Sequence, residues 1–307
     1  MKKGNGALQV IAVLAVLIVL FVSRLGDKLD SGESKVNSQD DTGIKTQNIS
    51  TSKSSSTSNT PNISLTTGNA SRAYQSFEEY ISIDNRGKEP VTITNWYLKN
   101  GKDKRAYNLG GQLKYFASDI ATIGRAALFI SPSGYNVLHN IVLEPGEKAI
   151  ITTGRMGAQT PYKIVSFKEN ICSGYLENLE EYKFTPALKR NCPQPENELG
   201  VSSLDTECRK FIEKMPSCQK PEFDTRDRDG EICRNCVNGK PLSSACVTFI
   251  KSHYSYDACI ANHVNDENFY GKTWRIFLGH GWEMWAKEYE TIELFDQYGQ
   301  LVKSRTY

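Results

Sequence analysis

The sequence predicts a mainly β protein, a β-sandwich that carries a small α-helical, disulfide-rich insertion. Apolar residues alternate with polar ones near both ends of the folded part, as in Ile81 and Ile83 and again in Ile292 and Leu294. A period of two places alternate side chains on one face of a strand. All eight cysteines lie instead in one segment, residues 172–259, where apolar residues recur at helical spacing. We therefore expect a sheet protein that is interrupted by a cross-linked helical segment.

Length and charge limit the classes of function. The chain has 307 residues, with 37 lysines and arginines against 35 aspartates and glutamates, so its formal charge is only +2. Proteins that bind nucleic acid through electrostatics present a strongly basic face. The sequence has no such basic run, and we therefore expect no nucleic-acid partner.

The amino-terminal segment has the pattern of a membrane anchor. Lys2 and Lys3 precede an apolar run over residues 7–22, and Arg24 closes this run. A run of this length is slightly short for a bilayer core of about 30 Å, but the residues that follow can extend it. No small-x-small cleavage site follows, so an uncleaved signal anchor over residues 1–25 is favoured over a cleaved signal peptide.

Both alternatives place most of the chain outside the cytoplasm, because positively charged flanks stay on the inner side. We expect a single-pass protein of the cell membrane, which contacts the membrane through residues 7–25 and has an extracytoplasmic carboxy-terminal domain. Residues 26–73 are rich in serine, threonine and asparagine. Such a composition buries too little apolar surface to fold, so the sequence predicts a disordered linker there and a folded domain over residues 74–307.

Eight short strands are expected in the folded domain. They are separated by turns that contain glycine or proline, such as residues 144–147. Short strands at this spacing are typical of a β-sandwich rather than of an alternating α/β sheet. The expected strands are residues 77–83, 91–98, 107–113, 127–130, 148–153, 274–278, 291–295 and 301–307.

A cysteine-rich helical insertion over residues 160–270 interrupts these strands. One helix is expected over residues 204–215, with Ser202 or Ser203 as its N-cap. Two shorter helices are expected near Cys246 and from Cys259 to His263. An insertion between two strands of a sandwich must leave and re-enter the sandwich at the same rim.

Several segments resemble the lamin-tail domain, an immunoglobulin-like module of nuclear lamins and of many bacterial surface proteins. The matching residues are 79–85, 91–98, 143–147, 292–302 and Tyr307. Asn95 stands where the family usually has glycine, and asparagine also tolerates a left-handed turn. The resemblance implies an immunoglobulin-like β-sandwich of bacterial type, membrane-anchored, that serves as a binding or scaffolding module. It carries over no catalytic residue.

Disulfides are the expected state of the cysteines outside the cytoplasm, because a small insertion with few apolar residues needs cross-links. The sequence does not determine the connectivity of eight cysteines. Local pairing is the hypothesis that we favour, since each pair then brackets a helix or turn. The expected pairs are Cys172 with Cys192, Cys208 with Cys218, and Cys246 with Cys259, which leaves Cys233 and Cys236.

The remaining pair, Cys233 and Cys236, allows two alternative interpretations. A C-x-x-C pair is the motif of thiol redox enzymes, although here loop residues flank it on both sides. Together with Cys259 and His263, the pair also has the spacing of a zinc site. We expect no cofactor if all the cysteines form disulfides. We expect a bound zinc ion if Cys233, Cys236, Cys259 and His263 form a metal site.

No catalytic motif accompanies these residues. The sequence lacks G-x-S-x-G, a phosphate-binding glycine loop and H-E-x-x-H, so we expect no catalytic residues and no enzymatic activity. Trp282 and Trp285, three apart on an expected helical turn, are the candidates for binding. They are expected to cover the open end of the sandwich, and a ledge for a sugar or a protein partner is the alternative.

These observations predict a non-enzymatic, membrane-anchored binding or scaffolding protein outside the cytoplasm. Its disulfide-linked insertion would form the face that meets a partner protein or an envelope glycan. The alternative is an envelope redox or zinc-dependent factor that uses Cys233 and Cys236.

Overall fold

The computed structural model describes residues 61–157, 159–226, 230–237 and 239–307. The expected membrane anchor and most of the expected linker lie outside these residues. Within the described part of the chain, no helix is long and apolar enough to cross a membrane. Residues 58–307 form one compact unit, and each of its three hydrophobic clusters uses only residues from that unit. We therefore expect residues 58–307 to fold on their own.

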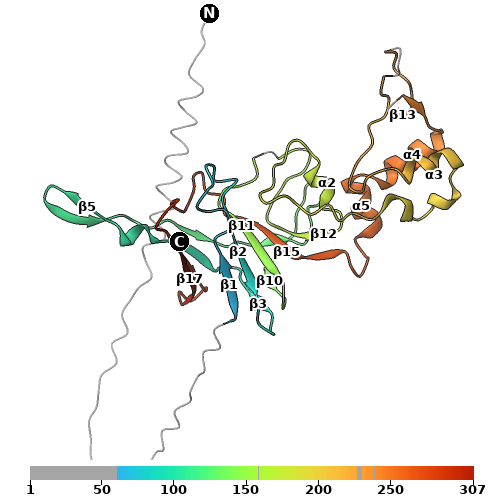
Figure 1. Ribbon diagram of the computed structural model, residues 1–307. Helices are drawn as coiled ribbons and strands as arrows, with labels where there is room; N and C mark the ends of the chain where they lie inside the picture. The colour runs from blue at the N-terminus through green and yellow to red at the C-terminus, as the bar shows by residue number, and fades with distance from the viewer. Residues whose placement is uncertain (1–60, 158, 227–229, 238) are drawn as a thin grey trace, which may run out of the picture. The chain divides into compact units, whose positions relative to one another are not determined.

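A seven-stranded sheet forms the centre of the unit (Figure 1). Three neighbouring strands are β2 (Tyr80–Asn85), β11 (Lys148–Thr152) and β15 (Tyr270–Phe277). β11 is antiparallel to β2 but parallel to β15, so the sheet is mixed. The other strands are β1 (Ile63–Thr66) beside β2, and β12 (Phe167–Asn170), β8 (Ala126–Ala127) and β9 (Leu138–His139) beyond β15.

A four-stranded antiparallel sheet joins the carboxy-terminal strands to strands from the first half of the folded part. Its order is β17 (Leu301–Thr306), β16 (Thr291–Phe295), β4 (Tyr97–Asn100) and β7 (Ile120–Thr122). Leu294 of β16 faces Leu98 of β4, and the ring of Tyr97 stacks on Phe295 with 4.9 Å between centroids. Gly299, with φ +81°, lies in the turn between β16 and β17, where the sequence predicts a hairpin.

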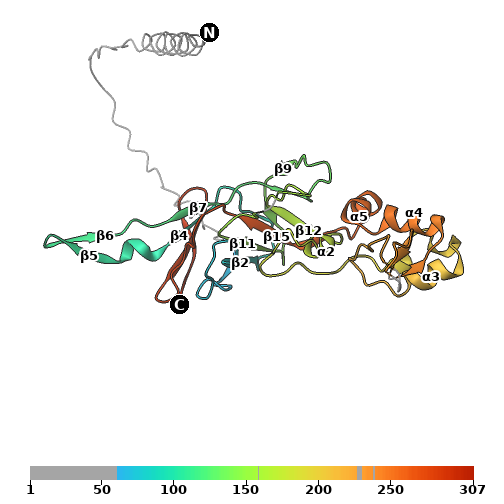
Figure 2. The same ribbon diagram turned by 90° about the horizontal axis from the view of Figure 1, so that it is seen from above.

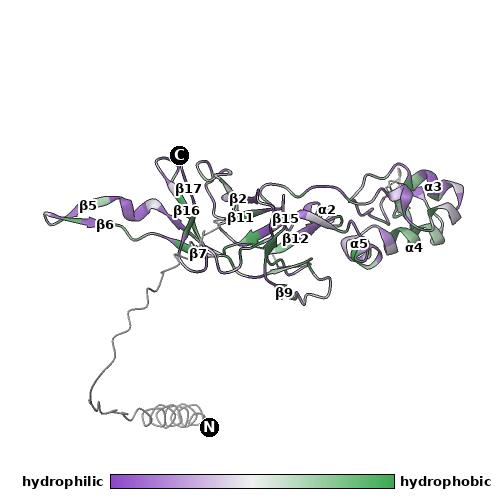
Figure 3. Ribbon diagram, turned by 90° about the horizontal axis from the view of Figure 1, so that it is seen from below, coloured by the Kyte–Doolittle hydropathy of each residue, from purple (hydrophilic) through white to green (hydrophobic). Residues whose placement is uncertain are grey.

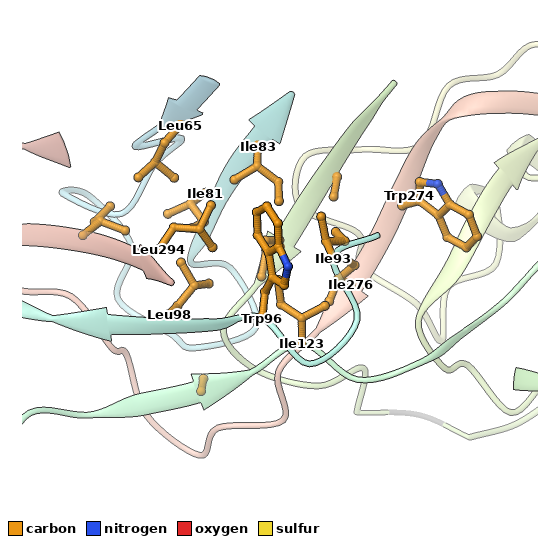
Figure 4. Packing of buried hydrophobic residues seen from close by; sticks show 14 of the residues in the cluster. Leu65, Ile81, Ile83, Ile93, Trp96, Leu98, Ile123, Trp274, Ile276 and Leu294 are labelled. Carbon is orange, nitrogen blue, oxygen red and sulfur yellow. The ribbon is translucent and has the colours of Figure 1, made fainter. Parts of the chain in front are cut away.

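One hydrophobic core contains residues of both sheets. The seven-stranded sheet contributes Ile81 and Ile83, and the four-stranded sheet contributes Leu98 and Leu294. Trp96 lies in the middle of this cluster (Figure 4). Figure 3 shows hydrophobic stretches along the central strands. These features confirm that the protein is mainly β, and β2, β4 and β16 alternate between buried and more exposed residues as predicted.

The folded part starts earlier than the sequence suggests. β1 lies inside residues 26–73, the range predicted to be a linker, and pairs with β2 along its whole length. Its residues Ile63 and Leu65 are buried in the core. The four-residue strand ISLT has the same alternation as the longer strands, but the polar residues around it conceal the signal.

The strand expected at residues 77–83 begins later, at Tyr80. The backbone N–H groups of Glu78 and Glu79 donate to the carbonyl of Gln75, which closes a turn and leaves Phe77 exposed. Asn95 has φ +68°, a left-handed conformation that asparagine tolerates.

A hairpin replaces the single strand expected at residues 107–113. β5 (Ala106–Leu109) and β6 (Gln112–Tyr115) pair with each other. Gly110 and Gly111, with φ +60° and +82°, make the two-residue turn between them. Two further pairs are β3 (Val91–Thr92) with β10 (Val142–Leu143), and β13 (Cys236–Val237) with β14 (Lys240–Pro241).

The insertion leaves and re-enters the large sheet at one pair of facing residues. Asn170, at the end of β12, faces Tyr270, at the start of β15. This confirms the expectation of a single rim. The start of the insertion differs from the expected range of 160–270, because β12 belongs to the seven-stranded sheet. The excursion therefore comprises residues 171–269.

Among its described residues, the insertion contains four short α-helices (Figure 2). They are α2 (Gly174–Glu177), α3 (Thr206–Ile212), α4 (Ser244–His253) and α5 (Tyr256–His263). The three predicted helices are α3, α4 and α5. The N-cap of α3 is Asp205 rather than Ser202 or Ser203, because residues 201–203 form a separate 3-10 turn.

Candidate binding cleft

Every cysteine lies among the described residues and forms a disulfide. The bonds are Cys172–Cys259, Cys192–Cys218, Cys208–Cys246 and Cys233–Cys236. Disulfide formation is therefore confirmed. The three predicted local pairs are wrong: Cys172–Cys192, Cys208–Cys218 and Cys246–Cys259.

Helix packing explains why the local pairs do not form. Cys208 and Cys246 lie in one hydrophobic cluster, in which buried residues of α3 pack against buried residues of α4. Cys172, Cys192, Cys218 and Cys259 lie in a second cluster, which also includes residues of the seven-stranded sheet. The two clusters separate the predicted partners Cys208 and Cys218, and likewise Cys246 and Cys259, but not Cys172 and Cys192. A disulfide requires Cα atoms within about 7 Å, so the packing of separate elements selects the partners.

A cleft of about 1050 Å³ opens where the insertion meets the sheet domain. Its volume is at the upper end of the range for small-molecule sites. Four segments form its wall: the turn before β12, helix α2, the chain after Cys218, and the facing ends of α4 and α5. Its lining residues are Pro161, Tyr162, Tyr175, Asn178, Leu179, Cys218, Gln219, Lys220, Pro221, Glu222, Phe223, Lys251, Ser255, Tyr256 and Asp257.

Tyrosines connect the two sides of this cleft. The Tyr162 hydroxyl donates to Asp257 Oδ1 at 2.5 Å, and the rings of Tyr162 and Tyr256 meet edge to face at 5.0 Å. The Tyr256 hydroxyl donates to the carbonyl of Ile130, on the sheet side. Burial, together with the hydrogen bond to Asp257, raises the pKa of Tyr162 well above its ordinary value. The tyrosine hydroxyl therefore stays protonated at physiological pH and remains a donor.

The opposite wall combines an aromatic ring with charge. Lys251 Nζ lies 5.1 Å from the centroid of the Phe223 ring, within the range of a cation–π contact. Asn178 Nδ2 donates to the carbonyl of Cys218 at 2.6 Å, and this bond holds the segment after Cys218 against α2. Disulfide Cys192–Cys218 fixes the same segment. A disulfide and a hydrogen bond thus hold parts of the wall in place, and the lining includes aromatic rings and charges of both signs.

The candidate zinc ligands do not come together. Cys259 is bonded to Cys172, and Cys233 is bonded to Cys236. His263 contacts two carboxylates instead, with Nδ1 at 2.7 Å from Asp266 and Nε2 at 3.0 Å from Glu198. Among the described residues, no group of three or more histidine, cysteine, aspartate or glutamate side chains is arranged to hold a metal ion.

Trp282 and Trp285 have different environments. Both lie in an irregular loop rather than on the expected helical turn. Trp285 is only 4% exposed and belongs to the core shared by the two sheets, whereas Trp282 is 63% exposed. Trp285 is therefore a core residue, whereas Trp282 is not. Trp282 meets His280 edge to face, with 6.3 Å between the ring centroids.

Two buried glutamates hold this loop in place. Glu79 accepts hydrogen bonds from the backbone N–H groups of Met284 and Trp285, at 2.7 and 3.3 Å. Glu290 accepts from Gly101 and from Ala286, at 2.8 and 3.0 Å. Burial raises the pKa of Glu79 above its ordinary value, although the two backbone donors favour its charged form.

Sequence reasoning missed the cleft and most of the residues that line it. Tyr162, Tyr175, Lys251 and Asp257 come from four elements, and none belongs to a motif with recognisable spacing. Their proximity depends on the Cys172–Cys259 disulfide and on the packing of α5 against the sheet domain. Comparison of the chain with protein-family models, with curated proteins and with solved structures finds no match.

Proposed function

We propose that this chain is a non-enzymatic binding protein of the cell surface, anchored in the membrane through residues 7–25. In this proposal, an immunoglobulin-like sandwich of the lamin-tail type is the scaffold, and the disulfide-linked insertion carries the binding face. The cleft at the base of the insertion is the binding site, and its ligand is an envelope glycan or a segment of another protein.

The cleft is the observation that carries this proposal. Its size and its aromatic residues are those of a ligand site, and charged and polar side chains line it as well. Disulfides fix two of its walls before any ligand arrives, and a preorganised site loses less entropy on binding. A ligand in the cleft could stack on its aromatic rings and form hydrogen bonds to Asp257, Lys251 and Asn178.

The cysteines support the proposed location. All eight are in disulfides, and disulfides persist in oxidising compartments outside the cytoplasm. A fractionation experiment tests the location. In intact cells, external protease should degrade residues 58–307, and alkaline extraction should leave the protein with the membrane. Deletion of residues 1–25 should abolish retention under alkaline extraction, and a deleted form that still resists this extraction would contradict the proposed anchor.

A thermal-shift screen tests the binding site. The folded unit, residues 58–307, is heated with panels of envelope oligosaccharides and of short peptides, and a ligand should raise its melting temperature. Lys251→Ala and Asp257→Ala should weaken that ligand at least tenfold. Glu207→Ala is the matched control, because Glu207 is an exposed acidic residue on α3 that does not line the cleft. Equal affinity of the cleft variants and the control would exclude the cleft as the site.

One observation favours redox activity as the second candidate. Of the four disulfides, only Cys233–Cys236 has no sulfur atom in a hydrophobic cluster, and Cys233 is partly exposed. An accessible disulfide can exchange with a substrate dithiol, which it oxidises while its own two cysteines are reduced. Oxidation of a reduced test protein by residues 58–307, lost in Cys233→Ser/Cys236→Ser, would support this function. No oxidation above that of the variant would exclude it.

A further inference from the structure

The β5–β6 hairpin stands away from the two sheets (Figures 1 and 2). Every residue of both strands is exposed. An isolated two-stranded hairpin is marginally stable in water, and contiguous exposed apolar side chains mark an interaction surface. This hairpin, residues 106–116, has five large side chains of that kind. They are Tyr107, Leu109, Leu113, Tyr115 and Phe116.

The apolar side chains occupy both faces of the hairpin. In the ladder, Tyr107 faces Lys114 and Leu109 faces Gln112, so Tyr107 and Leu109 share one face. Leu113 and Tyr115 lie on the other face, because neighbouring residues of a strand point in opposite directions. A flat protein partner would cover one face and leave the other in water. A fluid apolar medium that surrounds the hairpin covers both faces.

The charges at the base of the hairpin fit an anionic surface. Residues 102–116 contain four basic residues, Lys102, Lys104, Arg105 and Lys114, against one acidic residue, Asp103. Lys114 is the one charged residue within the strands themselves. The three other basic residues lie before β5 and form ion pairs with Asp119, Glu293 and Glu290. Each of the three keeps more than a third of its side chain exposed, so such pairs contribute little and remain accessible to phosphate groups.

We propose that the hairpin inserts into the surface of an anionic lipid bilayer. Its leucine and aromatic side chains enter the boundary between headgroups and acyl chains, where tyrosine is favoured. Lys114 and the basic residues at the base contact lipid phosphates. Insertion stays shallow, because the unpaired backbone groups on both hairpin edges must keep water or headgroup partners.

Under the proposed function, the anchor would keep the hairpin within reach of the membrane surface. Residues 26–60 separate the anchor from the described unit, and 35 residues span at most about 120 Å when fully extended. The hairpin would then hold the folded unit against the bilayer. This contact would orient the cleft and the insertion relative to the membrane.

Vesicle co-sedimentation tests the hairpin without the anchor. Residues 58–307 are mixed with vesicles of phosphatidylcholine alone, or with vesicles in which one lipid in three is phosphatidylglycerol. We expect binding to the anionic vesicles, and at least a tenfold lower partition coefficient for Leu109→Asp/Leu113→Asp. Leu199→Asp is the control, because Leu199 is 92% exposed on the insertion and should not change binding. Circular dichroism confirms that each variant is folded.

A second variant separates lipid charge from apolar insertion. Lys114→Gln should lower the affinity for anionic vesicles about fivefold, and should leave partition into phosphatidylcholine unchanged. Equal sedimentation of the wild type and of Leu109→Asp/Leu113→Asp would overturn the proposal. So would a dimer in analytical ultracentrifugation that the same variant abolishes, because the surface would then serve a second copy of the chain. Failure here leaves the proposed anchor intact, since residues 58–307 lack it.

Discussion

Ser243, the N-cap of α4, donates a hydrogen bond to Asp205, the N-cap of α3, with 2.7 Å between Ser243 Oγ and Asp205 Oδ2. Each cap residue also accepts from the backbone N–H three positions later, which belongs to Cys208 in α3 and to Cys246 in α4. These two cysteines form a disulfide. The two helix starts are therefore joined twice, once by their caps and once by a covalent bond.

Loss of the bond between the two caps should destabilise the part of the insertion that contains α3 and α4. Ser243→Ala removes both the N-cap of α4 and the bond to Asp205, and should lower the free energy of unfolding by about 1 kcal/mol. Asp205→Asn should be milder than Asp205→Ala, because asparagine is also a good N-cap. Urea denaturation of residues 58–307 measures these differences. Equal stability of Ser243→Ala and wild type would show that the disulfide alone holds the helix starts.

The same pair should make the insertion sensitive to acid. The N–H of Cys208 and the hydroxyl of Ser243 lower the pKa of Asp205 below its ordinary value. Its contribution to stability is therefore present above the unfolded pKa of about 3.9 and is lost as the pH falls through the lower folded value. In Asp205→Asn this acid-dependent loss should be smaller than in wild type between about pH 5 and pH 2.

Removal of the Cys172–Cys259 bond should loosen the whole insertion. This bond closes 87 residues and lies in the cluster that the insertion shares with the seven-stranded sheet. Cys172→Ala/Cys259→Ala should therefore cost about 4 to 5 kcal/mol in the chain-entropy account. Hydrogen exchange should rise in α2 and α5 together. In Cys208→Ala/Cys246→Ala, we expect faster exchange only in α3 and α4. An identical exchange pattern in both variants would show that the two disulfides do not stabilise separate parts of the insertion.

Mild reduction should open Cys233–Cys236 before the other disulfides. Cys233 is partly exposed, whereas Cys172, Cys192 and Cys208 are buried within hydrophobic clusters. Thiolate attack requires access to a sulfur atom. Stepwise reduction, alkylation and peptide mass mapping should show labels on Cys233 and Cys236 first. Early labelling at Cys192 or Cys218 would mean that the cleft wall opens in solution.

His263 should make stability fall as the pH rises. Burial by itself lowers the pKa of His263, but the hydrogen bonds to Asp266 and Glu198 outweigh it, so that the pKa lies above the ordinary value of 6.5. The added stability is present below the unfolded pKa and is lost as the pH rises through the folded value. His263→Asn should remove this dependence between about pH 6 and pH 8. His139→Asn, at an exposed histidine on β9, is the control for urea denaturation at each pH.

Short-range pattern accounts for the parts of this protein that the sequence predicts. Alternation in Ile81 and Ile83 and in Ile292 and Leu294 depends only on the geometry of a strand, so it predicts buried faces correctly. The spacing around Cys208 and Cys246 likewise predicts helices, because helical periodicity is local.

The cysteine content and the requirement for a single rim are also properties of the chain itself. Eight cysteines in one segment predict disulfides. An insertion between two strands predicts a return to the point of exit, which Asn170 and Tyr270 confirm.

Tertiary structure alone decides the disulfide partners, the cleft and the free hairpin. Cys172 meets Cys259 across 87 residues because α5 packs against the sheet domain. Tyr162 meets Asp257 for the same reason. The alternation in β5 and β6 resembles that of a buried strand, yet both faces are exposed because no other element of the described part of the chain covers them. A local pattern specifies which side chains share a face, but only long-range packing specifies what that face meets.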